Sequence, residues 1–330
     1  MKTVKKQIDD LNLQVTIEVA AEDYAEIERK KLAERRRTAE FKGFRKGNVP
    51  ASLIKKVYGE QALADSVNEV LGEALDEFIK KNKLNILGEP LTSEKQPEIT
   101  WEDGQSFKFV FDLGLSPEIN IDADKTDEVV SYQVTVAAKD KEEMAKNLEK
   151  FYKEQKKEKT AEEIDKEVTE RLEANLKQEA EWRMTKEIRE HFINKAGISL
   201  PEEFLKRWLY FANGGKVSKE DIEKEFAGFV QDFKWQLVRG YFMKKYNFSI
   251  SRKDLEDAAD AYVAYQYAMY GIGGVSKEII HQAAQEMLSD RKEISRIEEQ
   301  VEEQKVLEKL RDSITIKPKK ITMAKFRELK

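Results

Sequence analysis

Apolar and polar residues alternate in two short segments near the start of the chain. The first segment contains Leu11, Leu13, Val15, Ile17 and Val19, and the second contains Phe107, Phe109, Phe111 and Leu113. Because successive side chains of a strand point to opposite faces, each segment predicts a strand with one buried face. The tripeptide Glu102-Asp103-Gly104 predicts a turn just before the second strand.

Two helices are expected between these strands. The first, from Glu22 to Thr38, is strongly basic, and the second follows Pro50. Apolar residues of the second helix recur at steps of three and four, and they are Leu63, Val67, Val70, Leu71, Ala74, Leu75 and Phe78. This spacing is typical of an amphipathic helix that lies on a sheet. Strand, helix, loop, helix and hairpin together predict a small α+β domain over residues 1–115.

The remainder of the chain is predicted to be mostly helical. Ser116-Pro117 marks a boundary, and residues 116–137 are interpreted as a linker with one half-buried strand. Residues 138–330 are predicted to form a helical domain that binds substrates. It includes a long back helix over about 160–195, in which apolar residues recur every four positions. At 3.6 residues per turn this stripe winds around the helix, so its two ends are expected to pack against different parts of the molecule.

Two helical hairpins are predicted after the back helix. Arm 1 covers about 201–250 with a turn at 213–215, and arm 2 covers about 251–312 with a turn at 271–274. Apolar residues of the last helix recur every seven positions, at Ile280, Met287, Ile294 and Val301. This repeat predicts one helix with a narrow seam. The tail after it starts with a short β-like segment, and the predicted fold class is α+β: a small α+β domain followed by an elongated all-α cradle with two arms.

Composition indicates which kinds of site and which cellular location to expect. The 330 residues include no cysteine, which removes disulfides, thiolate metal sites and cysteine nucleophiles. No run of eighteen apolar residues occurs, and the N-terminus alternates where a signal peptide would be continuously apolar. These features predict a cytoplasmic protein that does not associate with membranes.

Positive charge is concentrated in one segment, which we call the basic block, residues 28–56. It holds eleven Lys and Arg residues and three Glu, an excess of eight, although the whole chain has a net charge of −5. A local positive block on an otherwise anionic molecule favours binding to phosphate or to an acidic surface.

Residues suited to catalysis are scarce. The two histidines, His191 and His281, lie on different predicted helices, and a lone helical histidine is more often structural than catalytic. No HExxH, GxSxG or dinucleotide-binding fingerprint occurs. We therefore expect no enzyme activity, no catalytic residue, no metal site and no cofactor.

Aromatic residues are concentrated in the predicted arms, because sixteen of the thirty-one Phe, Trp and Tyr residues lie between Phe204 and Tyr270. One interpretation is that the two hairpins pack on each other and use these rings as core. Thin hairpins have little interior, however, so some rings are expected to stay accessible as an adaptable binding surface. The candidate contacts are Phe226, Phe229, Phe233, Trp235, Phe242, Met243, Tyr262, Tyr265, Tyr267, Met269 and Tyr270.

The segment FKGFRKGNVP, residues 41–50, predicts a shaped loop inside the basic block. Gly43 and Gly47 permit backbone angles that other residues avoid, and Pro50 fixes the exit. Phe44 would stand at the apex as an apolar anchor, beside Arg45 and Lys46, which suit phosphate or carboxylate.

This loop resembles the ribosome-docking signature of the bacterial trigger factor family, chaperones that meet nascent chains at the exit of the ribosomal tunnel. AGISLPEEFLKRWL resembles the start of the family's first helical arm, and ITIKPKKITMAKFREL resembles its closing segment. The resemblance implies ribosome contacts through Phe44, Arg45 and Lys46, with Gly43, Gly47 and Pro50 shaping the loop. It also implies an ATP-independent holdase whose partners are the large ribosomal subunit (protein and rRNA near the tunnel exit) and unfolded or nascent polypeptides. Exposed apolar arms would in addition favour pairing of free molecules into homodimers.

One departure from the family concerns its FKBP-type prolyl isomerase domain. Family members usually carry this domain after the linker strand, whereas no sheet-rich and glycine-rich segment of that size follows Val136 here. We place the gap near residues 151–161 and do not carry over isomerase activity.

Three other functions are compatible with parts of the pattern. A periplasmic chaperone of the survival-protein type would share the helical cradle but gives no reason for the basic block. A nucleic-acid-binding protein would use the basic block and would not suppress aggregation. A protein that is only a helical scaffold would neither bind nucleic acid nor suppress aggregation.

Overall fold

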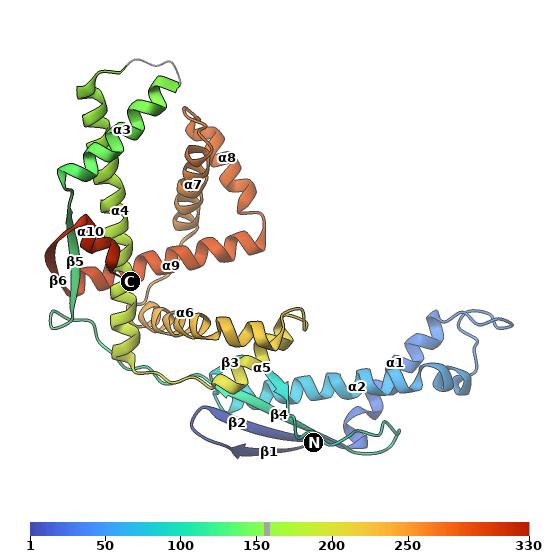
Figure 1. Ribbon diagram of the computed structural model, residues 1–330. Coiled ribbons are helices and arrows are strands. Elements are labelled where there is room, and N and C mark those ends of the chain that lie inside the picture. The colour runs from blue at the N-terminus through green and yellow to red at the C-terminus, as the bar shows by residue number, and fades with distance from the viewer. Residues whose placement is uncertain (155–158, 330) are drawn as a thin grey trace. The chain divides into compact units, whose positions relative to one another are not determined.

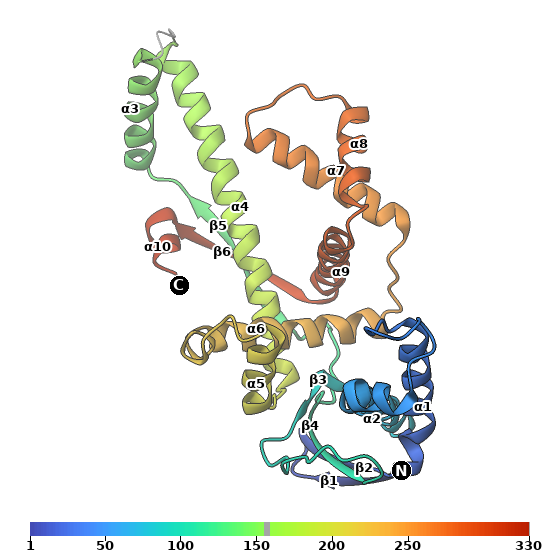
Figure 2. The ribbon, with the colours of Figure 1, turned by 90° about the vertical axis from the view of Figure 1, so that its right-hand side faces the viewer.

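The structure is a computed structural model that describes residues 1–154 and 159–329. Its strands are β1 (Lys2–Gln7), β2 (Asn12–Val19), β3 (Ile86–Thr92), β4 (Phe107–Leu115), β5 (Glu128–Thr135) and β6 (Thr315–Thr322). Its helices are α1 (Ala21–Thr38), α2 (Ala51–Lys81), α3 (Ala138–Glu154), α4 (Ala161–Ala196), α5 (Glu202–Ala212), α6 (Lys219–Lys245), α7 (Arg252–Met269), α8 (Lys277–Met287), α9 (Arg291–Ser313) and α10 (Met323–Glu328). Figures 1 and 2 show these elements in two orientations.

The chain forms two compact units. Unit 1 comprises residues 1–118 and 199–230, and unit 2 comprises residues 119–198 and 231–330. The α+β class predicted from the sequence is confirmed, since a small α+β region is followed by a mostly helical part. The compact units nevertheless divide the chain differently from the predicted domains, because residues 199–230 belong with the N-terminal residues.

Unit 1 is built on an antiparallel sheet with strand order β1-β2-β4-β3. The two alternating segments pair with each other, so that Val15 lies opposite Phe111 and Ile17 opposite Phe109. β1 was not expected from the sequence. All six of its residues are exposed, so it shows no burial pattern that alternation could reveal.

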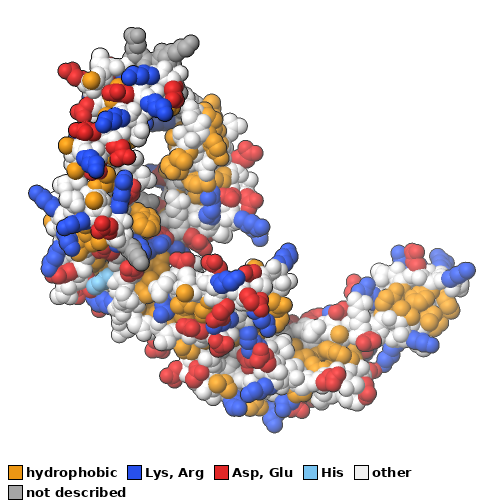
Figure 3. Space-filling model, in the orientation of Figure 1, with side chains coloured by type: hydrophobic (Ala, Val, Ile, Leu, Met, Phe, Trp, Pro, Cys, Tyr) orange, Lys and Arg blue, Asp and Glu red, His pale blue; other side chains and the backbone are white. Residues whose placement is uncertain are grey.

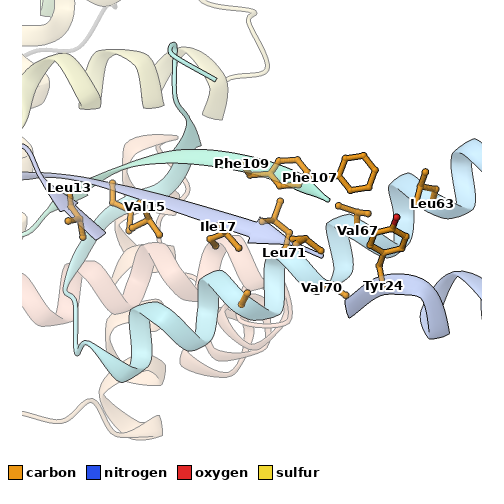
Figure 4. Close-up of a cluster of buried hydrophobic side chains, with 13 residues drawn as sticks. Leu13, Val15, Ile17, Tyr24, Leu63, Val67, Val70, Leu71, Phe107 and Phe109 are labelled. Atoms are coloured by element: carbon orange, nitrogen blue, oxygen red, sulfur yellow. The ribbon is translucent and has the colours of Figure 1, made fainter. Parts of the chain in front are cut away.

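The hydrophobic core of unit 1 lies between this sheet and α2. Leu13, Val15 and Ile17 of β2 face Val67 and Leu71 of α2 (Figure 4). Tyr24 of α1 and Phe107 and Phe109 of β4 complete the same cluster. The apolar residues of α2, which are spaced three and four positions apart, therefore cover one face of the sheet, as predicted.

Helix α5 packs on the sheet at two glycines. A Cβ atom added to Gly114 would lie 2.5 Å from the ring of Phe204, and one added to Gly88 would lie 2.6 Å from the ring of Trp208. No larger residue fits at either position without moving a ring. This close packing explains why α5, predicted as the start of arm 1, belongs to unit 1.

Unit 2 contains a parallel pair of strands, β5 and β6. Their register runs from Glu128 opposite Thr315 to Thr135 opposite Thr322, so the tail of the chain lies beside the linker strand. The sequence indicated only a short β-like start for this tail.

Helix α4 packs against different parts of unit 2 at its two ends, as the winding apolar stripe predicted. Its first half contributes Ile164, Val168, Leu172 and Leu176 to a cluster with residues of α3 and α10. Its second half contributes Met184, Ile188 and Phe192 to a cluster with α6 and α9. Thr160 caps the start of the helix and Gly197, at φ 57°, ends it.

The prediction of one continuous last helix is wrong. The chain breaks into α8 and α9 after Met287, and the Asp290 side chain caps the new helix by accepting a hydrogen bond from the Lys292 amide at 2.7 Å. Ile280 and Met287 pack with α7, so they do not continue a seam with Val301. Among the described helices, none is long and apolar enough to cross a membrane.

Candidate functional site

Two consecutive turns shape the loop between α1 and α2, which we call the docking loop, residues 41–50. The Phe44 amide donates to the Phe41 carbonyl at 3.0 Å, and the Asn48 amide donates to the Arg45 carbonyl at 2.9 Å. Gly43 and Gly47 occupy the third position of each turn with φ of 91° and 85°. Side chains added there would meet nothing within 4 Å, so glycine is required for its backbone angle and not for space.

A small local core supports the docking loop. Ala39, Val49 and Ile54 are buried together, and Phe41 packs on Tyr58 with ring centroids 6.2 Å apart. The Arg36 guanidinium donates from Nε to the Val49 carbonyl at 2.7 Å, which ties the exit of the loop to α1. Pro50 then accepts the first hydrogen bonds of α2 from Leu53 and Ile54.

The tip of the docking loop exposes the three residues predicted to make contacts. Phe44 is 44% exposed, and Arg45 and Lys46 are exposed beside it. The only carboxylate paired with Lys46 is that of Glu40, at 3.9 Å, and no ion pair forms at Arg45 within the described residues. The tip therefore presents one ring between cations that are largely uncompensated.

Other cations of the basic block are partly neutralised. Lys30 pairs with Glu26, Lys31 with Glu69 and Lys55 with Asp103. Sequence reasoning missed Val57, which follows Lys55 and Lys56 on α2 and is 53% exposed. An apolar residue directly after two lysines was the available signal. Figure 3 shows apolar side chains gathered at the end of α2 that carries the loop, with Lys and Arg around them.

The base of α1 is fixed to the turn before β4. The Tyr24 hydroxyl accepts a hydrogen bond from the Gly104 amide and donates one to the Gln105 carbonyl, both at 3.0 Å. Glu28 is buried beside this turn, and burial together with the negative charge of Asp103 raises the pKa of its carboxyl. The Lys55 ammonium, which bonds Asp103, lowers the pKa of that carboxyl.

Three of the predicted client contacts do not present their rings to solvent. Trp235 and Phe242 are 3% and 0% exposed and pack in the cluster that α6 forms with α4 and α9. Phe226 is buried as well, stacked on Phe229 and covered by the Lys206 ammonium 5.0 Å from its ring. The expectation that these three offer binding surface is therefore corrected: they act as core.

Aromatic rings in the second half of α6 pack in the core of unit 2. The Phe242 ring meets Phe192 of α4 edge to face, with centroids 5.4 Å apart. Met243 is partly buried against the same cluster. These rings pack on the back helix, which the sequence alternative of two hairpins packed on each other did not anticipate.

Predicted contacts on α7 remain accessible. Tyr265, Met269 and Tyr270 are 58%, 68% and 78% exposed, and Ile272 and Ile279, which the sequence reasoning missed, are 51% and 53% exposed. We call these five residues the arm 2 patch. Figure 3 shows apolar side chains gathered over α7 and α8.

The remaining predicted contacts lie between these extremes. Phe229 and Phe233 of α6 are partly buried. Tyr262 lies under the Arg296 guanidinium, 4.3 Å from its ring, and Tyr267 packs in the small α7 and α8 core.

Both histidines pair with carboxylates. His191 Nε2 lies 2.8 Å from Asp127, which also accepts from Lys195 at 2.7 Å, and His281 lies 3.1 Å from Asp260. Burial opposes ionisation of Asp127, but Lys195, the Asp124 amide and His191 outweigh it and lower the pKa of the carboxyl. In residues 1–154 and 159–329, no group of three His, Cys, Asp or Glu side chains could hold a metal ion. Each histidine therefore contacts a carboxylate within its own unit.

Comparison with family models decides the family. Residues 1–151 match the model described as "Bacterial trigger factor protein (TF)", and residues 180–330 match the one described as "Probable trigger factor, C-terminal domain". The chain belongs to the trigger factor family. Residues 152–179 lie outside both matches. They include most of the region 151–161 where the isomerase domain is expected to be missing, of which residues 155–158 fall outside the described residues.

Curated trigger factors also match part of the chain. The chain is 30% identical over 148 residues to the trigger factor of Francisella tularensis subsp. novicida (strain U112), a match that covers 45% of this chain and 32% of that relative. It is 28% identical over 156 residues to the trigger factor of Coxiella burnetii (strain CbuK_Q154), covering 47% of this chain and 34% of the relative. The chain thus spans about a third of the length of the curated relatives it matches.

A solved structure shares the fold. It is described as "Promiscuous Substrate Recognition in Folding and Assembly Activities of the Trigger Factor Chaperone", and it matches with a TM-score of 0.50 and 14% identity over 94% of this chain and 99% of that chain. At this identity the likeness concerns the fold alone. The trigger factor family and the trigger factor fold are therefore both established for this chain.

Proposed function

We propose that this protein is an ATP-independent chaperone that docks near the exit of the ribosomal tunnel and shields nascent or unfolded polypeptides. The observation that carries the proposal is the docking loop. Two glycine turns and a separate small core hold Phe44 exposed at its tip, directly before Arg45 and Lys46. An anchored ring among free cations fits a partner that combines protein and rRNA.

Client binding is assigned to the arm 2 patch. Its side chains are apolar or amphipathic and adaptable, and contacts of this kind bind many sequences weakly, with affinity summed over several sites. No nucleotide is required for release in this proposal. The proposed setting is the cytoplasm, and pairing of free molecules through exposed apolar surface is proposed as well.

Replacing Phe44, Arg45 and Lys46 together by alanine tests the docking function. We expect cosedimentation with ribosomes to weaken at least about a hundredfold, because an anchor and two cations are lost together. Suppression of aggregation of an unfolded client should change less than about twofold.

A matched control is available on α3. Phe151 is 47% exposed, close to the value for Phe44, and Lys150 and Lys153 next to it are exposed too. Replacing these three by alanine removes one phenylalanine and two cations, as the docking-loop variant does, and should leave ribosome binding unchanged. If both triple variants lose ribosome binding equally, the docking loop is not the contact site.

The absence of isomerase activity is a further part of the proposal. The purified chain should not accelerate the cis to trans isomerisation of a proline-containing peptide above the uncatalysed rate. Acceleration that survives purification to homogeneity would contradict it.

Nucleic-acid binding is the second candidate. It is favoured by Arg45, which forms no ion pair within the described residues, and by Lys46, whose pairing with Glu40 is long at 3.9 Å. It predicts that naked RNA binds as tightly as ribosomes and that aggregation is not suppressed. One binding series with naked rRNA beside intact ribosomes separates the two candidates.

A further inference from the structure

Positive charge is concentrated a second time near the end of the chain, in a segment that we call the basic tail, residues 315–329. The basic tail consists of β6 and α10 and lies within unit 2. It contains five Lys and Arg residues and one carboxylate, that of Glu328, although the whole chain has a net charge of −5. It shares no residue with the docking loop or the arm 2 patch.

Four of the five cations of the basic tail have no partner. Lys317 pairs with Glu128 of β5 at 2.5 Å. The other four are exposed, and none of them forms an ion pair or a side-chain hydrogen bond within residues 1–154 and 159–329; they are Lys319, Lys320, Lys325 and Arg327. Figure 3 shows Lys and Arg side chains gathered over β6 and α10, at the left of the view.

The strand beside β6 does not neutralise these cations. Glu128 is the one carboxylate on β5, and Lys317 already pairs with it. In the register of the two strands, Tyr132 lies opposite Lys319 and Gln133 lies opposite Lys320, and neither is charged. The two neighbouring lysines of β6 therefore have no negative charge across from them.

Helix α10 is fixed by its buried side, so its cations are held outward. Met323 and Phe326 are buried in the cluster that contains the first half of α4. The Arg183 guanidinium of α4 donates to the Leu329 carbonyl at 2.9 Å, which secures the end of the tail. The α4 carboxylate one turn further on, Glu187, pairs with Arg183 at 3.7 Å. The exposed positions of α10 thus belong to a surface with fixed backbone and excess positive charge.

An extended peptide is a poor fit to the open edge of this surface. Among the described strands β6 pairs with β5 alone, and Pro318 lies in the middle of β6. Proline has no N–H to donate, and proline and lysine on an edge strand oppose the pairing of a further strand. A ligand that is bound through charge, without strand pairing, fits better.

The surface also lacks a platform for unpaired bases. In β5, β6 and α10, which all lie within the described residues, no aromatic side chain is exposed. Single-stranded RNA is usually held by stacking of its bases on such rings, whereas double-stranded RNA is contacted mainly through phosphates and sugar hydroxyls. Exposed cations without exposed rings therefore favour a duplex.

We propose that the basic tail binds the phosphate backbone of double-stranded RNA and does not read its sequence. Lys319 and Lys320 would contact phosphates from β6, and Lys325 and Arg327 would contact them from α10. Lysine serves as a mobile point charge and arginine can make bidentate contacts with phosphate. The inference goes beyond the proposed docking, because the docking loop belongs to unit 1 and the basic tail to unit 2.

The test measures fluorescence anisotropy of a labelled RNA duplex with the full chain. Every protein also carries the triple alanine replacement of Phe44, Arg45 and Lys46, so that the docking loop does not contribute. In the tail variant, K319Q, K320Q, K325Q and R327Q are combined. We expect it to bind the duplex at least about tenfold more weakly, and its slope of log K against log salt to be less steep by about three to four, because four phosphate contacts are lost.

A matched control is available on α3, in the same unit. Lys139, Lys146, Lys150 and Lys153 are exposed, form no ion pair in the described parts of the chain, and lie among acidic residues. Replacing these four by glutamine removes the same charge and should change duplex binding less than about twofold. Circular dichroism melting verifies that both variants fold.

A crosslinking experiment locates the RNA without any change in the tail. A duplex that carries photoreactive 4-thiouridine should crosslink to peptides from residues 315–329. Crosslinks confined to other segments would overturn the proposal, even if the tail variant failed to fold.

Different outcomes of the binding series overturn different statements. Equal weakening in the tail variant and in the α3 variant would show a response to net charge only, and the proposal would fail. Unchanged affinity in the tail variant would assign the RNA to other cations. Displacement of the duplex by polyglutamate as readily as by unlabelled duplex of equal charge would reject RNA in favour of an acidic polypeptide. Each of these results leaves the docking proposal standing, since ribosome binding is tested separately at the docking loop.

Discussion

The docking loop and the arm 2 patch both combine glycines at positive φ with exposed aromatic side chains, but different partners are proposed for them. Each has two glycines at positive φ, namely Gly43 and Gly47 in the loop and Gly271 and Gly274 in arm 2. Each exposes aromatic side chains beside those glycines. The docking loop presents one ring between cations, whereas the arm 2 patch presents several apolar side chains without an excess of charge.

The supporting cores differ too. Beneath the docking loop, Val49 and Ile54 are 0% and 1% exposed, and two turns fix the backbone. Beneath the arm 2 patch, the fully buried residues are the small Ala259 and Ala284. A fixed ring among charges suits one partner of defined shape, and adaptable rings over a thin core suit many partners.

The largest expected effect is on the free energy of unfolding. It distinguishes buried from exposed aromatic residues among the predicted client contacts. Trp235→Ala should lower the free energy of unfolding by about 3–5 kcal/mol, because a large side chain leaves a cavity between α4, α6 and α9. Tyr270→Ala should change it by less than about 0.5 kcal/mol, since Tyr270 is 78% exposed. Urea unfolding of both variants makes the comparison, and equal destabilisation would refute the assignment of Trp235 to the core.

This contrast shows what the sequence could and could not predict. The backbone shape of the docking loop was predictable, because Gly43, Gly47 and Pro50 constrain the backbone locally. The use of the α6 rings was not, because Trp235 and Phe242 are buried by residues as distant as Phe192 and Val306. The pattern of one helix does not indicate which neighbours will cover it.

Two other elements illustrate the same limit. β1 is an exposed edge strand, so its sequence carries no alternation of burial. The break between α8 and α9 depends on capping by Asp290, and a seven-residue apolar repeat passes through the break undisturbed. In neither place does apolar periodicity indicate the element that forms.

Salt should act on the docking loop much more than on the arm 2 patch. If about three phosphate contacts form, raising the salt concentration from 50 to 200 mM should weaken ribosome binding on the order of 20- to 40-fold, because counterions compete for the phosphates. Client binding through apolar contacts should hold or strengthen slightly. Cosedimentation and aggregation assays over the same salt series measure both. If salt weakened ribosome binding and client binding equally, the assignment of docking to the docking loop and of client binding to the arm 2 patch would be wrong.

Glycine substitution tests whether the fixed backbone matters. At Gly43, Gly47, Gly271 and Gly274 an added Cβ would meet nothing within 4 Å, so alanine changes only the cost of positive φ, about 1 kcal/mol at each site. Gly43→Ala with Gly47→Ala should weaken ribosome binding about tenfold by displacing Phe44. Gly271→Ala with Gly274→Ala should change aggregation suppression less than about twofold. Equal losses in the two double variants would indicate that arm 2 also needs a defined loop.

Two buried carboxylates, one in each unit, should depend on pH in opposite ways. The pKa of Asp127 is lowered in the folded chain, so its contribution to stability is present above its unfolded pKa near 3.8 and is lost as pH falls through the folded value. The pKa of Glu28 is raised, so its contribution is present below its unfolded pKa near 4.5 and is lost as pH rises through the folded value.

The two carboxylates should therefore respond oppositely to neutral replacement at pH 7. Asp127→Asn should destabilise unit 2 by about 2–3 kcal/mol, because Lys195 and His191 lose their charged partner. Glu28→Gln, which removes a charge that burial disfavours, should stabilise unit 1 by about 1 kcal/mol or less. Thermal unfolding at pH 7 and at pH 4 measures both, and the Glu28→Gln gain should shrink at the lower pH. A Glu28→Gln variant that is less stable than the parent at pH 7 would show that the ionised carboxylate is needed to hold α1 against the turn before β4, and hence to support the docking loop.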